Sequence, residues 1–374
     1  MAEKKPKSIV LRLGSRTIEC GIEGDSKPLE IFNVHHFAER QQFTTDCGST
    51  TNHAQKPKEN SENTTAVETA HNYDLLMFNY LFHGDVLAFD SLEKFKSDLK
   101  IHLRRFLTKV FHKCGLSTIN AKIILLQNYS LTEFYLDIIK EVLLSHFLVR
   151  ALVIVPTPIM ISIASASSSA LVIDIGWNYT SIDVVYDNRV LTNYSCITNR
   201  AGCRLHYELL DMLEREGFNL SLISYRDVEN CIASLESMEE KGNNEDSLLM
   251  CGTYYVRAKL LRDLIKDMFV SDSYSDLEDY EMPIPQIVAN LVQHTLPIDL
   301  RKELVSCVIF NGRMTCIRGL KAMITDGIQT RLPTGLNARA IETIGEWQGA
   351  SIFSGVIKHI KKTEFLREYR NSKV

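Results

Sequence analysis

Two short apolar runs separated by turn-forming residues open the chain. Residues 8–13 (SIVLRL) and 17–22 (TIECGI) flank Gly14 and Ser15. Apolar and polar positions alternate in the second run, which is typical of a strand with one buried face. The pattern therefore predicts a β-hairpin at the start of the chain.

The same pattern returns in the middle of the chain. Residues 170–186 (ALVIDIGWNYTSIDVVY) combine an apolar run, a turn with Gly176 and a second, alternating run. Similarity between distant segments indicates an internal duplication. We therefore predict two lobes of one design, each of which begins with a hairpin whose turn faces the other lobe.

Apolar periodicity predicts helices and buried strands over most of the remaining chain. The helical spacing of apolar residues predicts helices at residues 95–111, 131–147, 207–216, 254–269, 286–295 and 298–301. Continuous apolar runs predict buried strands at residues 121–126, 152–155 and 305–310. A turn at residues 346–351 is expected to lead into a last helix.

Two polar segments and one uncharged segment indicate which parts of the chain are exposed to water and whether any part crosses a membrane. Residues 41–70 are polar and are expected to be either a disordered insertion or a mobile surface subdomain. Residues 232–247 are also polar, and we expect them to be exposed. Residues 151–173 carry no charge and are long enough to span a bilayer, but Pro156 and Pro158 interrupt their start. We interpret them as a strand, a short helix and a second strand, and we expect no insertion into a membrane.

Composition and charge narrow the class of protein. The 374 residues are 45% apolar, and 42 basic against 46 acidic residues give a net charge of −4. Such a chain can bury a large core, but it lacks the positive surface of a non-specific nucleic-acid binder, so we expect no direct nucleic-acid partner. Lys4, Lys5 and Lys7 could be a localisation signal, although a solvated basic terminus is the simpler interpretation.

The nine cysteines are scattered and form no C-x-x-C pair. Zinc sites need closely spaced ligand pairs, and disulfide frameworks are typical of small secreted chains. The N-terminal residues MAEKKPKSIV also lack the apolar core of a signal peptide. We therefore expect reduced thiols, no metal site and a cytoplasmic location.

Several segments, taken in order, resemble the actin family. IVLRLGSRTIECGIEGD and LVIDIGWNYTSIDVV are similar to that family's two phosphate loops. The segments HGDV, DSLEKF, IDLRKELVSCVIFNGRMTCIRGL and EWQGASIFSGV are similar to the entry into the first-lobe helix, the adenosine loop and the tail segment. The resemblance implies an α/β, actin-like fold, which is a duplicated ribonuclease-H-like bilobal fold with a central cleft.

The resemblance also implies how the chain is divided. The first lobe would hold residues 1–164 plus 337–374, with a polar small subdomain at about 35–70. The second lobe would hold residues 165–336, with a small subdomain at about 201–283.

A nucleotide cleft between the two hairpin turns is implied as well. The positions that match the family are Gly14, Ser15, Asp174, Gly176 and Gly312, which makes them the candidate cofactor-binding residues. ATP would be the cofactor, at most as a structural ligand. Asp174 could hold a hydrated magnesium ion, or it could bond to backbone N–H groups of its own turn.

Other positions depart from the family pattern. Arg12 stands where the family has a carboxylate, and Glu19 stands where it has a phosphate-binding lysine. Further replacements are Trp177 and Asn178 in the second loop, Thr157 at the position of the water-orienting glutamine, Arg313 in the adenosine loop, and Leu264 and Ile265 where charged nucleotide contacts occur. Hydrolysis needs a water placed in line with the phosphate. We therefore predict no catalytic residues and no enzymatic activity.

Three segments are most similar to the actin-related subunits at the pointed end of dynactin: NAKIILLQNYSLTEFYLDIIKEVL, PTPIMISIASASSSALVIDIG and LPIDLRKELVSCVIFNGR. This resemblance implies a structural subunit of the cytoskeleton that caps an actin-like filament and supports dynein-based transport. Its partners would be an actin-like protomer and other pointed-end subunits, contacted through surfaces around residues 335–348 and the cleft between subdomains. The alternative is an actin-related subunit of a chromatin-remodelling complex. Arg12, Glu19 and Thr157 disfavour a third class, the kinase-like or chaperone ATPases.

Overall fold

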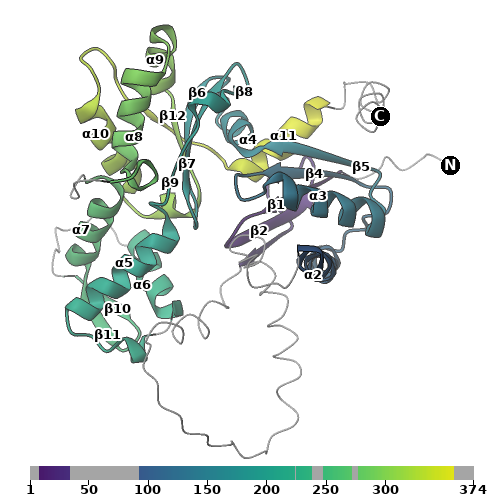
Figure 1. Ribbon diagram of the computed structural model, residues 1–374, viewed down its shortest axis with the longest axis horizontal. Coiled ribbons are helices and arrows are strands. Elements are labelled where there is room, and N and C mark those ends of the chain that lie inside the picture. Colours follow the sequence, from purple (N-terminus) through teal and green to yellow (C-terminus); the bar gives the residue numbers. More distant parts are fainter. Residues whose placement is uncertain (1–7, 34–91, 224, 238–246, 272–276, 358–374) are drawn as a thin grey trace, which may run out of the picture.

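The computed structural model describes residues 8–33, 92–223, 225–237, 247–271 and 277–357. Figure 1 shows two lobes, each built around its own β-sheet with helices packed against it. The fold is therefore mixed α/β and bilobal, as the sequence predicts. The predictions for residues 35–70 and for Lys4, Lys5 and Lys7 lie outside the described residues.

The first lobe is built on a five-stranded sheet with the order β3-β2-β1-β4-β5. Its strands are β1 (Ser8–Leu13), β2 (Thr17–Ile22), β3 (Glu30–Asn33), β4 (Lys122–Gln127) and β5 (Ala151–Pro156). The predicted hairpin is the antiparallel pair β1–β2, whereas β4 lies parallel to both β1 and β5. The helices α2 (Leu92–Lys113) and α3 (Glu133–Glu141) pack on one face of this sheet and form a core with it.

The second lobe repeats this topology in the sheet β13-β12-β6-β7-β8, with β9 paired to β7. Its strands are β6 (Ala170–Ile175), β7 (Thr180–Tyr186), β8 (Arg189–Val190), β9 (Cys196–Thr198), β12 (Val308–Asn311) and β13 (Ala340–Ile341). β6 and β7 form an antiparallel hairpin, and β12 lies parallel to both β6 and β13. The predicted duplication is confirmed at the level of strand order and direction.

The helices of the second lobe enclose the largest apolar core of the described residues. They are α5 (Gly202–Arg215), α6 (Tyr225–Ser237), α7 (Ala258–Phe269), α8 (Ile284–Asn290), α9 (Ile298–Val305) and α10 (Leu320–Arg331). A two-stranded sheet, β10 (Leu248–Cys251) and β11 (Tyr254–Arg257), precedes α7. The prediction of a helix from residue 254 was therefore wrong at its start, because those residues pair with β10.

The prediction of an exposed segment at residues 232–247 was wrong where the structure describes it. Residues up to Ser237 belong to α6, and Ile232 and Leu235 are each only 4% exposed. Cys231 is also buried on this face. A narrow apolar stripe therefore anchors an otherwise polar helix, and polar composition alone concealed it.

Two further helices differ from their predicted form. The helix predicted at residues 131–147 ends as α3 at Glu141 and continues as a π-helical turn, Val142–His146. The predicted turn at residues 346–351 is instead the start of α11 (Glu346–Ile357). Gly349 accounts for that error, because a Cβ at this position would lie 1.9 Å from the Met160 carbonyl oxygen. Gly349 therefore permits a close helix contact and does not form a turn.

The connection between the two sheets runs through α4 (Thr157–Ala164), as predicted for residues 151–173. Met160 of α4 packs in a core with β1, β4 and β5, and Ile161 packs on β6 and β7. α11 lies against α4, and the fully buried Trp347 donates a hydrogen bond to the Val10 carbonyl oxygen at 3.2 Å. Among the described residues, every helix is too short or too polar to cross a bilayer.

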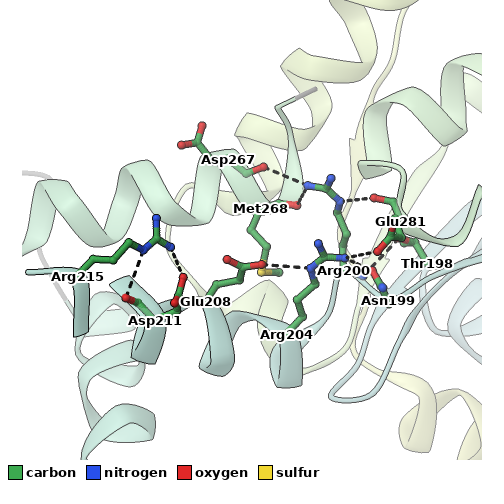
Figure 2. A network of polar contacts seen from close by, with 10 residues as sticks. All are labelled: Thr198, Asn199, Arg200, Arg204, Glu208, Asp211, Arg215, Asp267, Met268 and Glu281. Atoms are coloured by element: carbon green, nitrogen blue, oxygen red, sulfur yellow. Dashed lines mark hydrogen bonds and ion pairs between the residues drawn. The ribbon is translucent and has the colours of Figure 1, made fainter. Parts of the chain in front are cut away.

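A buried arginine joins separate parts of the second lobe (Figure 2). Arg200 is 1% exposed and donates to the carbonyl oxygens of Asp267 at 3.1 Å and Met268 at 2.5 Å. Its Nε donates to the Glu281 carbonyl oxygen at 2.6 Å. The last carbonyl groups of a helix need such external donors. Arg200 therefore ties the end of α7 to residues 279–281 (η6) and to the sheet.

Candidate functional site

A cavity of about 290 Å³ lies between the turns of the two hairpins. Its walls come from the β1–β2 turn, the β6–β7 turn, α6 and the segment after β12. The structure brings all five candidate residues to this cavity, namely Gly14, Ser15, Asp174, Gly176 and Gly312. Their role in ligand binding stays a prediction.

The two turns are closed by equivalent hydrogen bonds. The N–H of Gly14 donates to the Thr17 carbonyl oxygen at 3.0 Å, and the N–H of Gly176 donates to the Tyr179 carbonyl oxygen at 3.1 Å. The internal duplication thus extends to the hydrogen bonds of the turns. Each of these N–H groups is used within its own turn, so neither is directed at a ligand in the cavity.

Side chains of the two turns meet across the cleft. Asn178 donates from Nδ2 to Ser15 Oγ at 3.1 Å. The Arg16 guanidinium carbon lies 3.6 Å from the centre of the Trp177 ring, and Arg16 Nη2 is 3.3 Å from Glu229 Oε1 on α6. A cation over an indole face is among the stronger contacts of its kind. Arg16 therefore connects the first lobe to two elements of the second.

The Trp177 side chain packs closely against α5 of the second lobe. Its ring meets His206 of α5 edge-on at 4.6 Å, and a Cβ on Gly202 would lie 2.7 Å from Trp177 Cε3. Burial, together with the charge of Arg16, lowers the pKa of His206 to about 3. His206 is therefore neutral at physiological pH and serves as a packing partner. Gly202, which has no Cβ, therefore makes room for the Trp177 ring.

Arg12 sits in a cluster of carboxylates at the end of β1. Its Nη1 donates to Thr17 Oγ1 at 2.6 Å and lies 3.4 Å from Glu19 Oε1. Its Nε contacts Glu346 Oε1 at the start of α11. Arg12 and Glu19 are direct partners in the β1–β2 register. The two charge reversals that the sequence presents separately therefore form one cross-strand ion pair.

Asp174 lies at the end of β6, within electrostatic reach of this cluster. Asn311 Nδ2 donates to Asp174 Oδ1 at 3.0 Å. Burial and the charge of Glu346 raise the pKa of Asp174 to about 7, although Arg12 acts in the opposite direction. Burial also raises the pKa of Glu346, against the effect of Arg12. One guanidinium cannot neutralise all of these carboxylates, so Asp174 keeps its proton below about pH 7.

The cleft residues do not fit the ligand that the resemblance implies, ATP with a divalent cation. A hard cation needs ionised oxygen ligands free of competing positive charge, whereas Asp174 already accepts a hydrogen bond from Asn311 and interacts electrostatically with Arg12. Within the described ranges, no group of three or more His, Cys, Asp or Glu residues could hold a metal ion. A phosphate chain needs backbone donors at these turns, and two of them, the N–H groups of Gly14 and Gly176, are already used within their turns.

The remaining predicted positions lie in different places. Arg313 lines the cavity and is exposed. Thr157 begins α4, is 3% exposed and is not part of the cavity wall. Leu264 and Ile265 pack in the core of the second lobe, so α7 does not supply the wall that the sequence assigned to it. The wall comes from α6, through Glu229, Asn230, Ile232 and Ala233.

A second contact between the lobes lies beside the cavity, and the sequence pattern did not predict it. Tyr129, which follows β4 in the first lobe, donates from its hydroxyl to Asp183 of β7. Tyr179 accepts a hydrogen bond from the N–H of Ser130 at 3.2 Å, and the rings of Tyr129 and Tyr179 meet edge-on at 6.2 Å. Burial raises the pKa of Tyr179 to about 12, so its hydroxyl stays neutral. These contacts join the lobes without any ligand.

Comparison with known proteins adds one finding. A family model described as Actin matches residues 3–255, which is more than half of the 374 residues and includes both hairpins. No curated protein matches the chain.

Proposed function

The chain belongs to the actin family, and from this premise we propose that it is a non-catalytic structural subunit of an actin-like assembly. The observation that carries the proposal is the contact of Arg16 with Trp177 and Glu229 across the cleft. A cleft that its own side chains hold together needs no nucleotide to join its lobes. A subunit of this kind suits a fixed place in an assembly better than a cycle of polymerisation.

The place that we propose is the pointed end of the actin-like filament of dynactin, in the cytoplasm and the cytoskeleton. The similarity of three segments to pointed-end actin-related subunits supports it. There the protein would cap the filament and support dynein-based transport along microtubules. We also propose that residues 1–164 plus 337–374 form the first lobe and that residues 165–336 form the second.

A contact surface for the neighbouring protomer is proposed around residues 335–348 and the adjoining face of α11. Ile344 is 60% exposed and Ile352 is 50% exposed, although both are large and apolar. The N–H of Ile344 donates to the Ala164 carbonyl oxygen at 3.5 Å, which places this surface beside α4. Contiguous exposed apolar patches mark protein interfaces, and we propose that Ile344 and Ile352 belong to such a patch.

The proposal is tested by tagging the protein at its native level, purifying it gently and identifying the co-purifying chains by mass spectrometry. We expect an actin-like filament protein together with dynein-activator subunits. Recovery of a chromatin-remodelling ATPase in their place would refute the dynactin assignment and leave the fold unaffected.

A matched pair of variants tests the surface. Ile344→Arg places a charge on the proposed contact, whereas Ile298→Arg places the same charge on α9, where Ile298 is 76% exposed. We expect Ile344→Arg to lose the filament protein and Ile298→Arg to retain it. Equal recovery with both variants would place the contact elsewhere.

A further inference from the structure

Charged side chains from four elements meet where the two lobes join. Arg12 comes from β1, Glu19 from β2, Asp174 from β6 and Glu346 from α11. Arg12 pairs with Glu19 and Glu346, and it also interacts electrostatically with Asp174. This group, which we call the Arg12 cluster, contains three carboxylates and one cation.

The burial of the cluster makes its positive charge necessary. The side chains of Arg12 and Glu346 are only 16% and 8% exposed. Buried carboxylates are costly unless a cation or hydrogen-bond donors face them. Although burial alone would lower the pKa of Arg12, Glu346 and Glu19 raise it, so the guanidinium stays charged. Without Arg12, the three carboxylates would share one site with no positive charge from the cluster.

The guanidinium also fills the space inside the first turn. A Cβ on Gly14 would lie 3.2 Å from Arg12 Nη1 and 3.3 Å from Arg12 Cζ. Thr17 Oγ1 accepts from the same Nη1 at 2.6 Å and fixes its position. The positive group is therefore held against the turn by β1, β2 and α11 together.

We propose that the Arg12 guanidinium is the resident cation of this cleft. It supplies the positive charge that Glu19 and Glu346 require, and it makes closure of the cleft independent of a bound metal ion or nucleotide. The inference concerns the cleft that the proposed function also uses, but it does not involve the partner. The co-purification result and the test below can therefore fail separately.

The test is chemical rescue of the folded protein. Arg12→Ala leaves a cavity of guanidinium shape, and we expect the Tm to fall by about 5–15 °C because removing one partner of a buried ion pair is strongly destabilising. Guanidinium chloride at millimolar concentration, far below denaturing levels, should restore part of this loss. Sodium chloride at equal ionic strength and urea at equal concentration should not.

The unmodified protein and a surface variant serve as controls. We expect the Tm of the unmodified protein to be unchanged by EDTA, by magnesium, by magnesium-ATP and by millimolar guanidinium. Arg150→Ala, which removes an exposed arginine, should behave in the same way. A Tm of the unmodified protein that falls with EDTA, or rises with magnesium or magnesium-ATP, would overturn the proposal.

A double variant keeps the test decisive if Arg12→Ala does not fold. Arg12→Met removes the cation at similar volume, and Glu346→Gln then removes the carboxylate that loses its partner. We expect the double variant to have a higher Tm, or a larger folded yield, than Arg12→Met alone. A double variant no more stable than Arg12→Met would show that Arg12 acts only through packing and would overturn the proposal.

Discussion

Asp174→Asn is the substitution whose effect follows most directly from the electrostatics of the cleft. The asparagine amide has the same shape as the carboxylic acid. Its oxygen can still accept the hydrogen bond from Asn311 Nδ2, which is 3.0 Å long in the unmodified protein. Only the ionisation is removed. Because burial and Glu346 hold the pKa of Asp174 at about 7, ionisation of Asp174 is unfavourable in the folded protein.

The sign and size of the effect follow from proton linkage. The ordinary pKa of Asp174 is 3.8, against about 7 in the folded protein. Between these values the unfolded chain binds fewer protons than the folded protein, so the free energy of unfolding falls as pH rises. At about 1.4 kcal/mol per pKa unit, the loss is roughly 4 kcal/mol by neutral pH. Asp174→Asn should remove this loss.

The assay is denaturant unfolding of the protein and the variant from pH 5 to pH 8. We expect the variant to gain stability relative to the unmodified protein as pH rises, and to be at least as stable near pH 7.5. Some pH dependence will remain, because burial also raises the pKa of Glu346. Asp263→Asn, at an exposed position on α7, should leave the original pH dependence in place. Parallel stability curves for Asp174→Asn and the unmodified protein would show that Asp174 does not titrate with a raised pKa in the folded protein.

Three further substitutions test other parts of the structure. Arg200→Met should lower the free energy of unfolding by about 3–5 kcal/mol in denaturant titrations, because it leaves buried carbonyl groups of α7 without donors. Arg215→Met, on the exposed side of α5, should lower it by less than about 1 kcal/mol. Gly349→Ala should lower the Tm and destabilise the protein by about 1–3 kcal/mol or more through its contact with α4, and Ile352→Ala on the same helix should have a smaller effect. Asp174→Ala should still co-purify with the partners of the unmodified protein, because no bound cation holds the lobes together; a folded variant that loses its partners would contradict this.

The elements of this fold that carry strong local signals were predictable. The hairpins β1–β2 and β6–β7 combine alternating apolar positions with a turn glycine, and both formed where the pattern placed them. Their similarity predicted the duplication of the sheet topology. The helix α6 was missed because its buried face is a narrow stripe, which includes Ile232 and Leu235, within a polar sequence.

The site was predictable in location but not in chemistry. The positions of Arg12 and Glu19 on either side of the first turn could have indicated a cross-strand pair, since the register of a hairpin follows from its turn. Nothing local indicates that Glu346 reaches the same guanidinium, because α11 arrives there through tertiary packing on α4. The fit of Trp177 likewise depends on Gly202, which belongs to a different element.

The nucleotide content of the purified protein shows whether the cleft is closed without a ligand. The protein is purified from its native source without added nucleotide, denatured with acid, and the released nucleotides are separated and quantified against the protein concentration. We expect no stoichiometric ATP or ADP, because Arg12 and Arg16 hold the cleft together. One nucleotide retained per chain would contradict this expectation.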